Sequence, residues 1–236
     1  MIRGGSEPLV DMLTSSAPLA PTFRGRFLGG LAVSPDGRAL VASEGSSGSS
    51  THAALARWAL PGFQSLSGFE HWSPLDRLAF SPNGQFLAGI WSGYVGSWSA
   101  VFELRFAVSG GLDRRYQPFG WAFPSRGFVS FTRDSSTCAF GWEDEFHVLD
   151  ISTGTSRYLR RVEAQFRDAA FTGSGQHFAT VGDGGVLKLW DVKTWQVMRE
   201  YDWQCGPLTS LAFTADGSAG VCGTADGRLV QFDVDE

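Results

Sequence analysis

An internal repeat constrains the fold of this chain more strongly than any other feature of its sequence. Five segments share one pattern, an apolar stretch followed by a short polar turn and a second apolar stretch; they are residues 30–40, 78–87, 129–140, 169–178 and 211–220. The apolar residues before the turns are 47, 51, 40 and 42 positions apart; they are Val33, Phe80, Phe131, Phe171 and Phe213. A period of this length is typical of repeats built from four short strands.

The chemistry of the turns supports this alignment. Proline fixes φ at the second turn position, as at Pro35 and Pro82, and glycine tolerates the positive φ of a tight reversal. Glycine follows the apolar marker by four positions in four segments, whereas the third has Ser135, where we expect a looser turn. A third alternating stretch follows in every repeat, and one bulky residue of each is expected to pack in the core; these are Trp58, Phe106, Leu149, Trp190 and Phe232.

The third stretches resemble a known family. Trp190-Asp191 resembles the Trp-Asp dipeptide that names the WD repeats, and Phe232-Asp233 and Leu149-Asp150 are similar to diverged copies of it. The resemblance covers residues 27–236 and implies an all-β fold, a β-propeller whose four-stranded blades stack around an axis. The non-enzymatic binding of other macromolecules is what this resemblance implies for function.

A second part of the resemblance lies where a repeat begins. His71 stands where the family has a histidine before the first strand, and in the family this histidine often joins an aspartate of a later turn in a buried network. Asp226 occupies such a turn position in the fifth repeat, but that repeat has Gln204 in place of the histidine. We therefore expect degenerate networks in this chain.

The five repeats are expected to form five blades; they are residues 27–70, 71–119, 120–162, 163–203 and 204–236. The fifth repeat stops after its third stretch, so the N-terminal segment 1–26 is expected to supply a strand that completes this blade and closes the ring. We expect a monomer. The alternative is an incomplete ring, which needs another chain or further sequence.

Composition and charge exclude several classes of partner. A formal net charge of -5 disfavours nucleic acid, because binding to phosphates requires clustered Lys and Arg. No window approaches the roughly 20 apolar residues of a membrane-spanning helix, so no membrane partner is expected. The cysteines Cys138, Cys205 and Cys222 are odd in number and far apart, which favours a reducing, cytoplasmic location. The four histidines are scattered over different repeats, so no metal and no cofactor is predicted.

The second repeat contains the best candidate for a binding surface. Residues 90–100 are predicted to form a loop in which Trp91, Tyr94 and Trp98 stand among Gly and Ser, a composition typical of contact loops. Trp72, Trp142 and Trp203 are expected on the same rim. The alternative is that these rings fill gaps between blades.

The sequence therefore predicts a non-enzymatic scaffold that binds a protein or peptide through this aromatic rim. Two alternatives stay open. One is a hydrolase of glycans or small molecules in the central funnel, which requires two facing carboxylates with shifted pKa values. The other is a purely architectural module of a larger assembly. The acidic residues 143–145 do not favour the hydrolase, because they fall in a predicted hairpin turn where charges are solvated.

Overall fold

The computed structural model describes residues 27–45, 53–71, 75–94, 98–116, 127–142, 145–159, 165–214 and 216–234. Within these ranges the chain folds into strands joined by turns, as predicted for an all-β protein. There is no helix in this part of the chain, and hence none with the length and apolar character needed to cross a membrane. The proposed ring-closing segment 1–26 lies outside the described residues.

The strands form five antiparallel sheets, in which each strand pairs with the next one along the chain. The first sheet contains β1 (Phe27–Val33), β2 (Ala39–Gly45), β3 (Ala53–Ala59) and β4 (Gln64–His71). The second contains β5 (Arg77–Phe80), β6 (Phe86–Tyr94), β7 (Trp98–Phe106) and β8 (Leu112–Tyr116). The third contains β9 (Gly127–Phe131), β10 (Thr137–Trp142), β11 (Glu145–Asp150) and β12 (Ser156–Leu159). The fourth contains β13 (Phe166–Phe171), β14 (His177–Gly182), β15 (Val186–Asp191) and β16 (Val197–Asp202), and the fifth β17 (Leu208–Phe213), β18 (Ala219–Thr224) and β19 (Leu229–Asp233).

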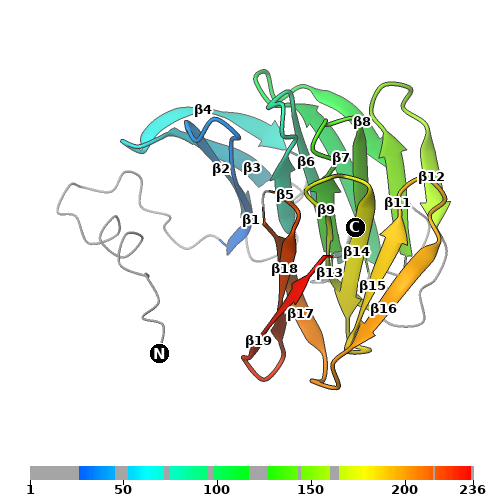
Figure 1. Ribbon diagram of the computed structural model, residues 1–236. Coiled ribbons are helices and arrows are strands. Elements are labelled where there is room, and N and C mark those ends of the chain that lie inside the picture. Colours follow the sequence, from blue (N-terminus) through cyan, green and yellow to red (C-terminus); the bar gives the residue numbers. More distant parts are fainter. Residues whose placement is uncertain are drawn as a thin grey trace.

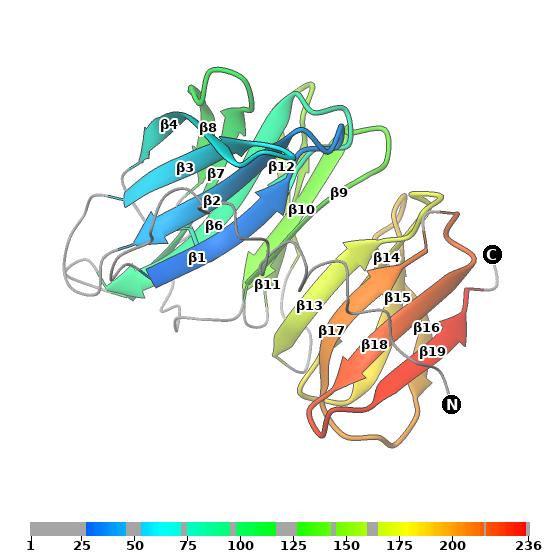
Figure 2. The same ribbon diagram turned by 90° about the vertical axis from the view of Figure 1, so that its left-hand side faces the viewer.

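The sheets are arranged by contacts between their first strands. β1 contacts β5, β5 contacts β9, β9 contacts β13, and β13 contacts β17. Figures 1 and 2 show the sheets following one another in this order. Among the described residues no contact of comparable extent joins β17 back to β1. The arrangement is compatible with a β-propeller.

Apolar side chains fill the spaces between consecutive sheets. The first and second sheets share a cluster around Leu55, and the fourth and fifth share one around Leu187. Between the second and third sheets the rings of Phe102 and Phe140 are stacked with centroids 3.7 Å apart. Phe146 lies in the cluster between the third and fourth sheets. Since these side chains are almost fully buried, burial between sheets provides the main stabilising term.

The turn between the first and second strands has the same hydrogen bonds in every sheet. A side-chain hydroxyl accepts the N–H of the residue five positions later, at 2.8 to 3.3 Å; the hydroxyls are those of Ser34, Ser81, Thr132, Thr172 and Thr214. The third turn is not looser than the others, because Ser135 adopts a φ of 62°. Its hydroxyl accepts the N–H of Asn83 at 3.0 Å, which links the third turn to the second.

The second sheet differs from the sequence prediction in its alignment. The N–H groups of Ala107 and Ile151 make the equivalent hydrogen bond, each to the residue before the second strand of its own sheet, at 2.8 and 2.9 Å. This bond aligns Arg105, rather than Phe106, with the buried Leu149. Phe106 is 45% exposed, so its assignment to the core was wrong.

An ion pair allows an arginine to occupy this core position. Arg105 is 7% exposed, and its Nε and Nη2 lie 2.9 and 2.8 Å from Oε2 of Glu103. Its Nη1 donates to the carbonyl of Gly110 at 2.8 Å. Arg115 approaches the other carboxylate oxygen at 3.6 Å. The charge of the buried guanidinium is thus balanced inside the sheet, which the local sequence pattern did not reveal.

The ion pair generates a prediction about stability. The substitution Glu103→Ala should reduce the free energy of unfolding by about 3–5 kcal/mol, because it leaves the buried charge of Arg105 without its opposite charge. Arg115→Ala is the matched control, since Arg115 is partly exposed and its loss should cost at most about 1 kcal/mol. Urea denaturation measures both. Equal losses of unfolding free energy in the two variants would contradict the role of Glu103 as the counter-charge of Arg105.

The turns generate a second prediction. Thr132 is buried, accepts the N–H of Thr137 at 3.0 Å and donates to Oδ1 of Asp134 at 2.7 Å. Thr132→Ala should therefore reduce the free energy of unfolding by about 1–2 kcal/mol, whereas Thr132→Ser keeps the hydroxyl and should cost less. Chemical denaturation of both variants tests this. The idea is wrong if serine is no better than alanine.

Candidate functional site

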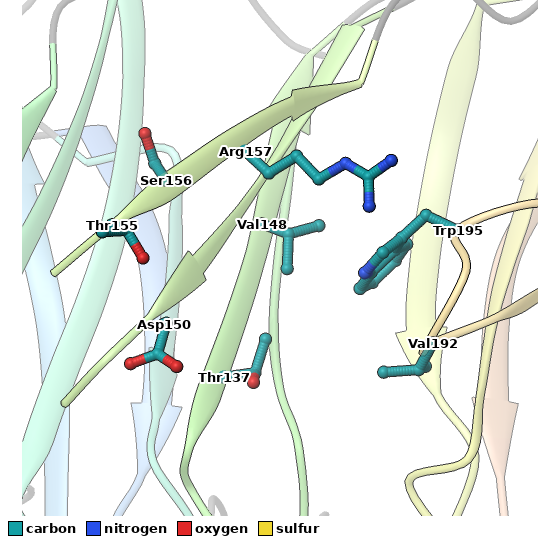
Figure 3. Close-up of a pocket in the computed structure, with 8 residues that line it drawn as sticks. All are labelled: Thr137, Val148, Asp150, Thr155, Ser156, Arg157, Val192 and Trp195. Carbon is teal, nitrogen blue, oxygen red and sulfur yellow. The ribbon is translucent and has the colours of Figure 1, made fainter. Parts of the chain in front are cut away.

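A pocket of about 320 Å³ opens between the third and fourth sheets. It is lined by Thr137, Val148, Asp150, Thr155, Ser156 and Arg157 of the third sheet and its turns, and by Val192 and Trp195 of the fourth. The third sheet supplies a mostly polar wall and the fourth an apolar one (Figure 3). This volume lies at the lower end of the range for small-ligand sites, roughly 300–1,000 Å³, and suits one large side chain.

Trp195 is one of two bulky aromatic residues at its repeat position. The turn between the third and fourth strands has one residue with positive φ in each four-stranded sheet; these are Phe63, Gly110, Gly154 and Trp195, with φ of 50°, 69°, 72° and 58°. A bulky residue in this left-handed region is strained, at a cost of about 1–3 kcal/mol. The Trp195 ring packs against Phe146 and Phe178 with centroids 5.9 and 5.7 Å away. This packing holds the indole as a wall of the pocket.

The preceding junction shows what fills the equivalent space elsewhere. Between the second and third sheets, the Arg114 guanidinium lies against Gly154, so that an added Cβ would collide with it. The hydroxyl of Tyr116 donates to the carbonyl of Gly154 at 3.1 Å. Glycine therefore makes room for side chains of the second sheet. At the next junction, Trp195 stands in place of glycine and a pocket opens beside it.

Arg157 is the counterpart of Arg114 at the pocket. The two arginines lie opposite Val148 and Leu104, each one position before the core residue of the third strand. Arg114 forms an ion pair with the adjacent aspartate at 3.0 Å. Arg157 is exposed, takes part in none of the hydrogen bonds or ion pairs of the described residues, and extends from β12 toward Trp195 (Figure 3). Among the described residues, the cation at the mouth of the pocket therefore has no partner.

Asp150 contributes the opposite charge. Its Oδ1 accepts the N–H of Thr153 at 2.8 Å and the hydroxyl of Ser152 at 2.7 Å. These bonds, that from Thr153 first, lower the pKa of the carboxyl below its ordinary value of 3.8, so Asp150 is ionised at neutral pH. Within the described part of the chain, Oδ2 has no hydrogen-bond partner. The pocket thus offers a free acceptor, a free cation and an apolar wall.

The predicted aromatic rim is only partly described. Trp72 lies outside the described residues. Trp91 and Tyr94 belong to β6 and Trp98 begins β7, so the described parts of the segment predicted as a loop are paired strands, with Tyr94 opposite Trp98. Tyr and Trp favour strands, and this preference prevails over the neighbouring Gly and Ser. Whether these residues bind a partner stays a prediction.

Two further tryptophans of this predicted surface lie apart from each other. Trp142 ends β10, is 6% exposed and belongs to the cluster between the second and third sheets. Trp203 is half-buried against Phe232 and Tyr201, between the fourth and fifth sheets. The structure therefore does not bring Trp142 and Trp203 together. The ring of Trp142 offers little surface for a partner.

The positions taken from the repeat pattern have structural roles. Trp58 and Trp190 are buried, and Nε1 of Trp190 donates to the Thr180 hydroxyl at 3.0 Å. Asp191 accepts the N–H of Thr194 at 2.7 Å and so shapes its turn. Two other repeat positions, Phe232 and Asp233, lie on β19.

The two positions of the expected network lie on β4 and in the turn before β19. His71 ends β4, opposite Ala53. Asp226 accepts the Thr224 hydroxyl and forms an ion pair with Arg228 at 2.7 Å.

A scan of protein-family models and a search of curated proteins find no match to this chain.

Sequence reasoning missed the pocket, because its walls come from different repeats. One signal was present, namely a tryptophan in the fourth repeat where the third has glycine. Across the described ranges, no three His, Cys, Asp or Glu side chains form a group that could hold a metal ion.

The environment of His147 generates a prediction about pH. Its ring is stacked on Phe140 at 5.2 Å and lies 5.1 Å from Tyr158. Both ring nitrogens are buried and have no hydrogen-bond partner among the described residues. Burial lowers its pKa below the ordinary 6.5, although Glu145 opposes this shift. The unfolded chain therefore takes up a proton first, and stability falls as the pH decreases below about 6.5.

Urea denaturation at pH 7 and pH 5 measures this loss. The variant His147→Phe should lose less stability between these values than the natural chain. The carboxyls with lowered pKa do not interfere, because they titrate below 3.8. Identical losses in both proteins would exclude His147 as the cause.

Proposed function

We propose that this chain is a small WD-repeat-like β-propeller that serves as a non-enzymatic interaction module for protein or peptide partners. The pocket between the third and fourth sheets carries the proposal. It combines an indole wall and a valine floor with a guanidinium and a carboxylate oxygen that have no partner among the described residues, and these groups suit a side chain of a peptide.

The repeat comparison supports this proposal. The equivalent space at the preceding junction is filled by Arg114 and Tyr116, which pack on Gly154. A strained tryptophan and an unpaired arginine replace that arrangement at the pocket. Backbone strain of this kind is concentrated at ligand-binding and active sites, where the surrounding structure holds it in place.

The hydrolase alternative receives less support from the inner strands. Burial raises the pKa of Asp168 on β13, while hydrogen bonds from the N–H groups of Leu211 and Ala169 and the charge of Arg77 lower it. The N–H of Leu211 lies 2.9 Å from Oδ2 of Asp168. This carboxylate therefore connects the fourth and fifth sheets, and the charge that it senses is a cation.

A cytoplasmic monomer belongs to the same proposal. Cys138, Cys205 and Cys222 are free thiols, which is the form that a reducing compartment maintains. Light scattering of the purified chain tests the monomer.

Selection from a phage-displayed library of random peptides tests the interaction module. We expect the natural chain to enrich peptides that fail to bind two pocket variants, Trp195→Gly and Thr155→Arg. Trp195→Gly gives the fourth sheet the glycine that the third sheet has at this turn position, and it removes the indole wall of the pocket. Thr155→Arg places a bulky side chain at an exposed position that lines the pocket, without altering the core. Thermal unfolding checks that both variants are folded.

The predicted rim is tested by the same selection. A triple variant with Trp91→Ala, Tyr94→Ala and Trp98→Ala should retain the pocket-dependent peptides. Peptides lost only in this triple variant would place the binding surface on the β6–β7 hairpin instead. Enrichment no greater than on an unrelated protein would contradict the interaction module itself.

A further inference from the structure

The arginine at the pocket mouth differs from both of its counterparts in the other sheets. Arg114 on β8 pairs with Asp113, and Arg199 on β16 donates to the hydroxyl of Tyr201 at 3.3 Å. Arg157 on β12 has no such partner among the described residues, although it occupies the same position relative to the third strand. Two of the three arginines are thus satisfied internally. The third is available for a ligand, and a guanidinium is best matched by a carboxylate.

The edge of the third sheet determines how a peptide reaches this arginine. β12 is the outermost strand of its sheet, in the order β12-β11-β10-β9, and Ser156 and Arg157 on it line the pocket. An extended peptide that follows such an edge presents alternate side chains to one face. Arg157 lies opposite Val148 on the face that lines the pocket. Side chains two positions apart in the peptide therefore meet the apolar wall and the guanidinium.

Asp150 suits a donor on the side chain that enters the pocket, because β12 separates β11 from the backbone of a peptide at the sheet edge. Its Oδ1 is used by the turn, whereas among the described residues Oδ2 has no partner and can accept an N–H such as that of an indole. Asp150 and Val148 lie two residues apart on β11, so the acceptor and the apolar floor share one face. The volume of about 320 Å³ holds one side chain rather than a longer segment.

We propose that the pocket selects extended peptides in which an aromatic or large aliphatic anchor and an acidic residue are separated by one position. This inference rests on the proposed interaction function and specifies its partner. The anchor lies against Val192 and Trp195, and the acidic side chain pairs with Arg157. The opposite choice, a basic residue at that position, would place two cations together at the mouth.

Fluorescence anisotropy with three labelled heptapeptides tests the proposal on the full chain. The probes share the sequence Gly-Ser-Trp-Ser-X-Ser-Gly, in which X is Glu, Gln or Lys. The Glu probe should bind about two- to fivefold more tightly than the Gln probe, because Arg157 is exposed and an exposed ion pair adds only a modest gain over a neutral contact. The Lys probe should bind most weakly. The preference should decrease as salt is added, since the pair is exposed.

Charge reversal identifies the residue responsible. Arg157→Glu should reverse the order, so that the Lys probe binds best. Lys193→Glu is the matched control, because it makes the same change of charge at an exposed position beside Val192 that does not line the pocket. That control should keep the preference for Glu.

The outcomes separate this inference from the proposed function. Equal binding of the three probes, abolished by Thr155→Arg, would overturn the acidic preference and leave the interaction module standing. A second outcome is that all three probes fail to bind while the library yields pocket-dependent peptides that have no acidic residue near the anchor. That result would also overturn the acidic preference and leave the interaction module standing. Failure of the probes and of the library selection would overturn both.

Discussion

The burial of apolar faces between consecutive sheets is the constraint on which this structure depends. Each inner sheet has apolar side chains on both faces, so it requires a neighbour on either side. The third sheet shows this directly, since Phe140 packs toward the second sheet and Phe146 toward the fourth. The repeated turns with their hydroxyl hydrogen bonds fix the strand registers that bring these faces together. Stability in such an arrangement is distributed over the junctions.

Because every junction is built from the same parts, differences between junctions mark where a site can form. Arg114 against Gly154 fills one junction, and Arg157 with Trp195 leaves the next one open. The change involves side chains at the turn and on the outermost strand, while both turns place a residue with positive φ at the same position. A repeat fold can thus acquire a pocket without altering its strands.

The sequence predicted what depends on local chemistry. The five turns, the order of strands and the buried Trp58 and Trp190 follow from patterns within single repeats, and the structure confirms them. The core position of Arg105 could not be predicted from the repeat pattern. Its charge is compensated by Glu103 on the same strand and by the carbonyl of Gly110 in the following turn. The pocket did not follow either, since its walls belong to two repeats and meet only after the sheets have packed.

Trp195 connects stability with the binding proposed for this site. Glycine would adopt its positive φ without strain, as it does in the second and third sheets, so the tryptophan is not required by the turn. Packing against Phe171 and Phe178 offsets part of the strain, but it uses only part of the indole, because the side chain also lines the pocket. A ring fixed in this way loses little side-chain entropy when a ligand contacts it. The same contacts that hold Trp195 in an unfavourable conformation therefore prepare it as a rigid surface for a partner.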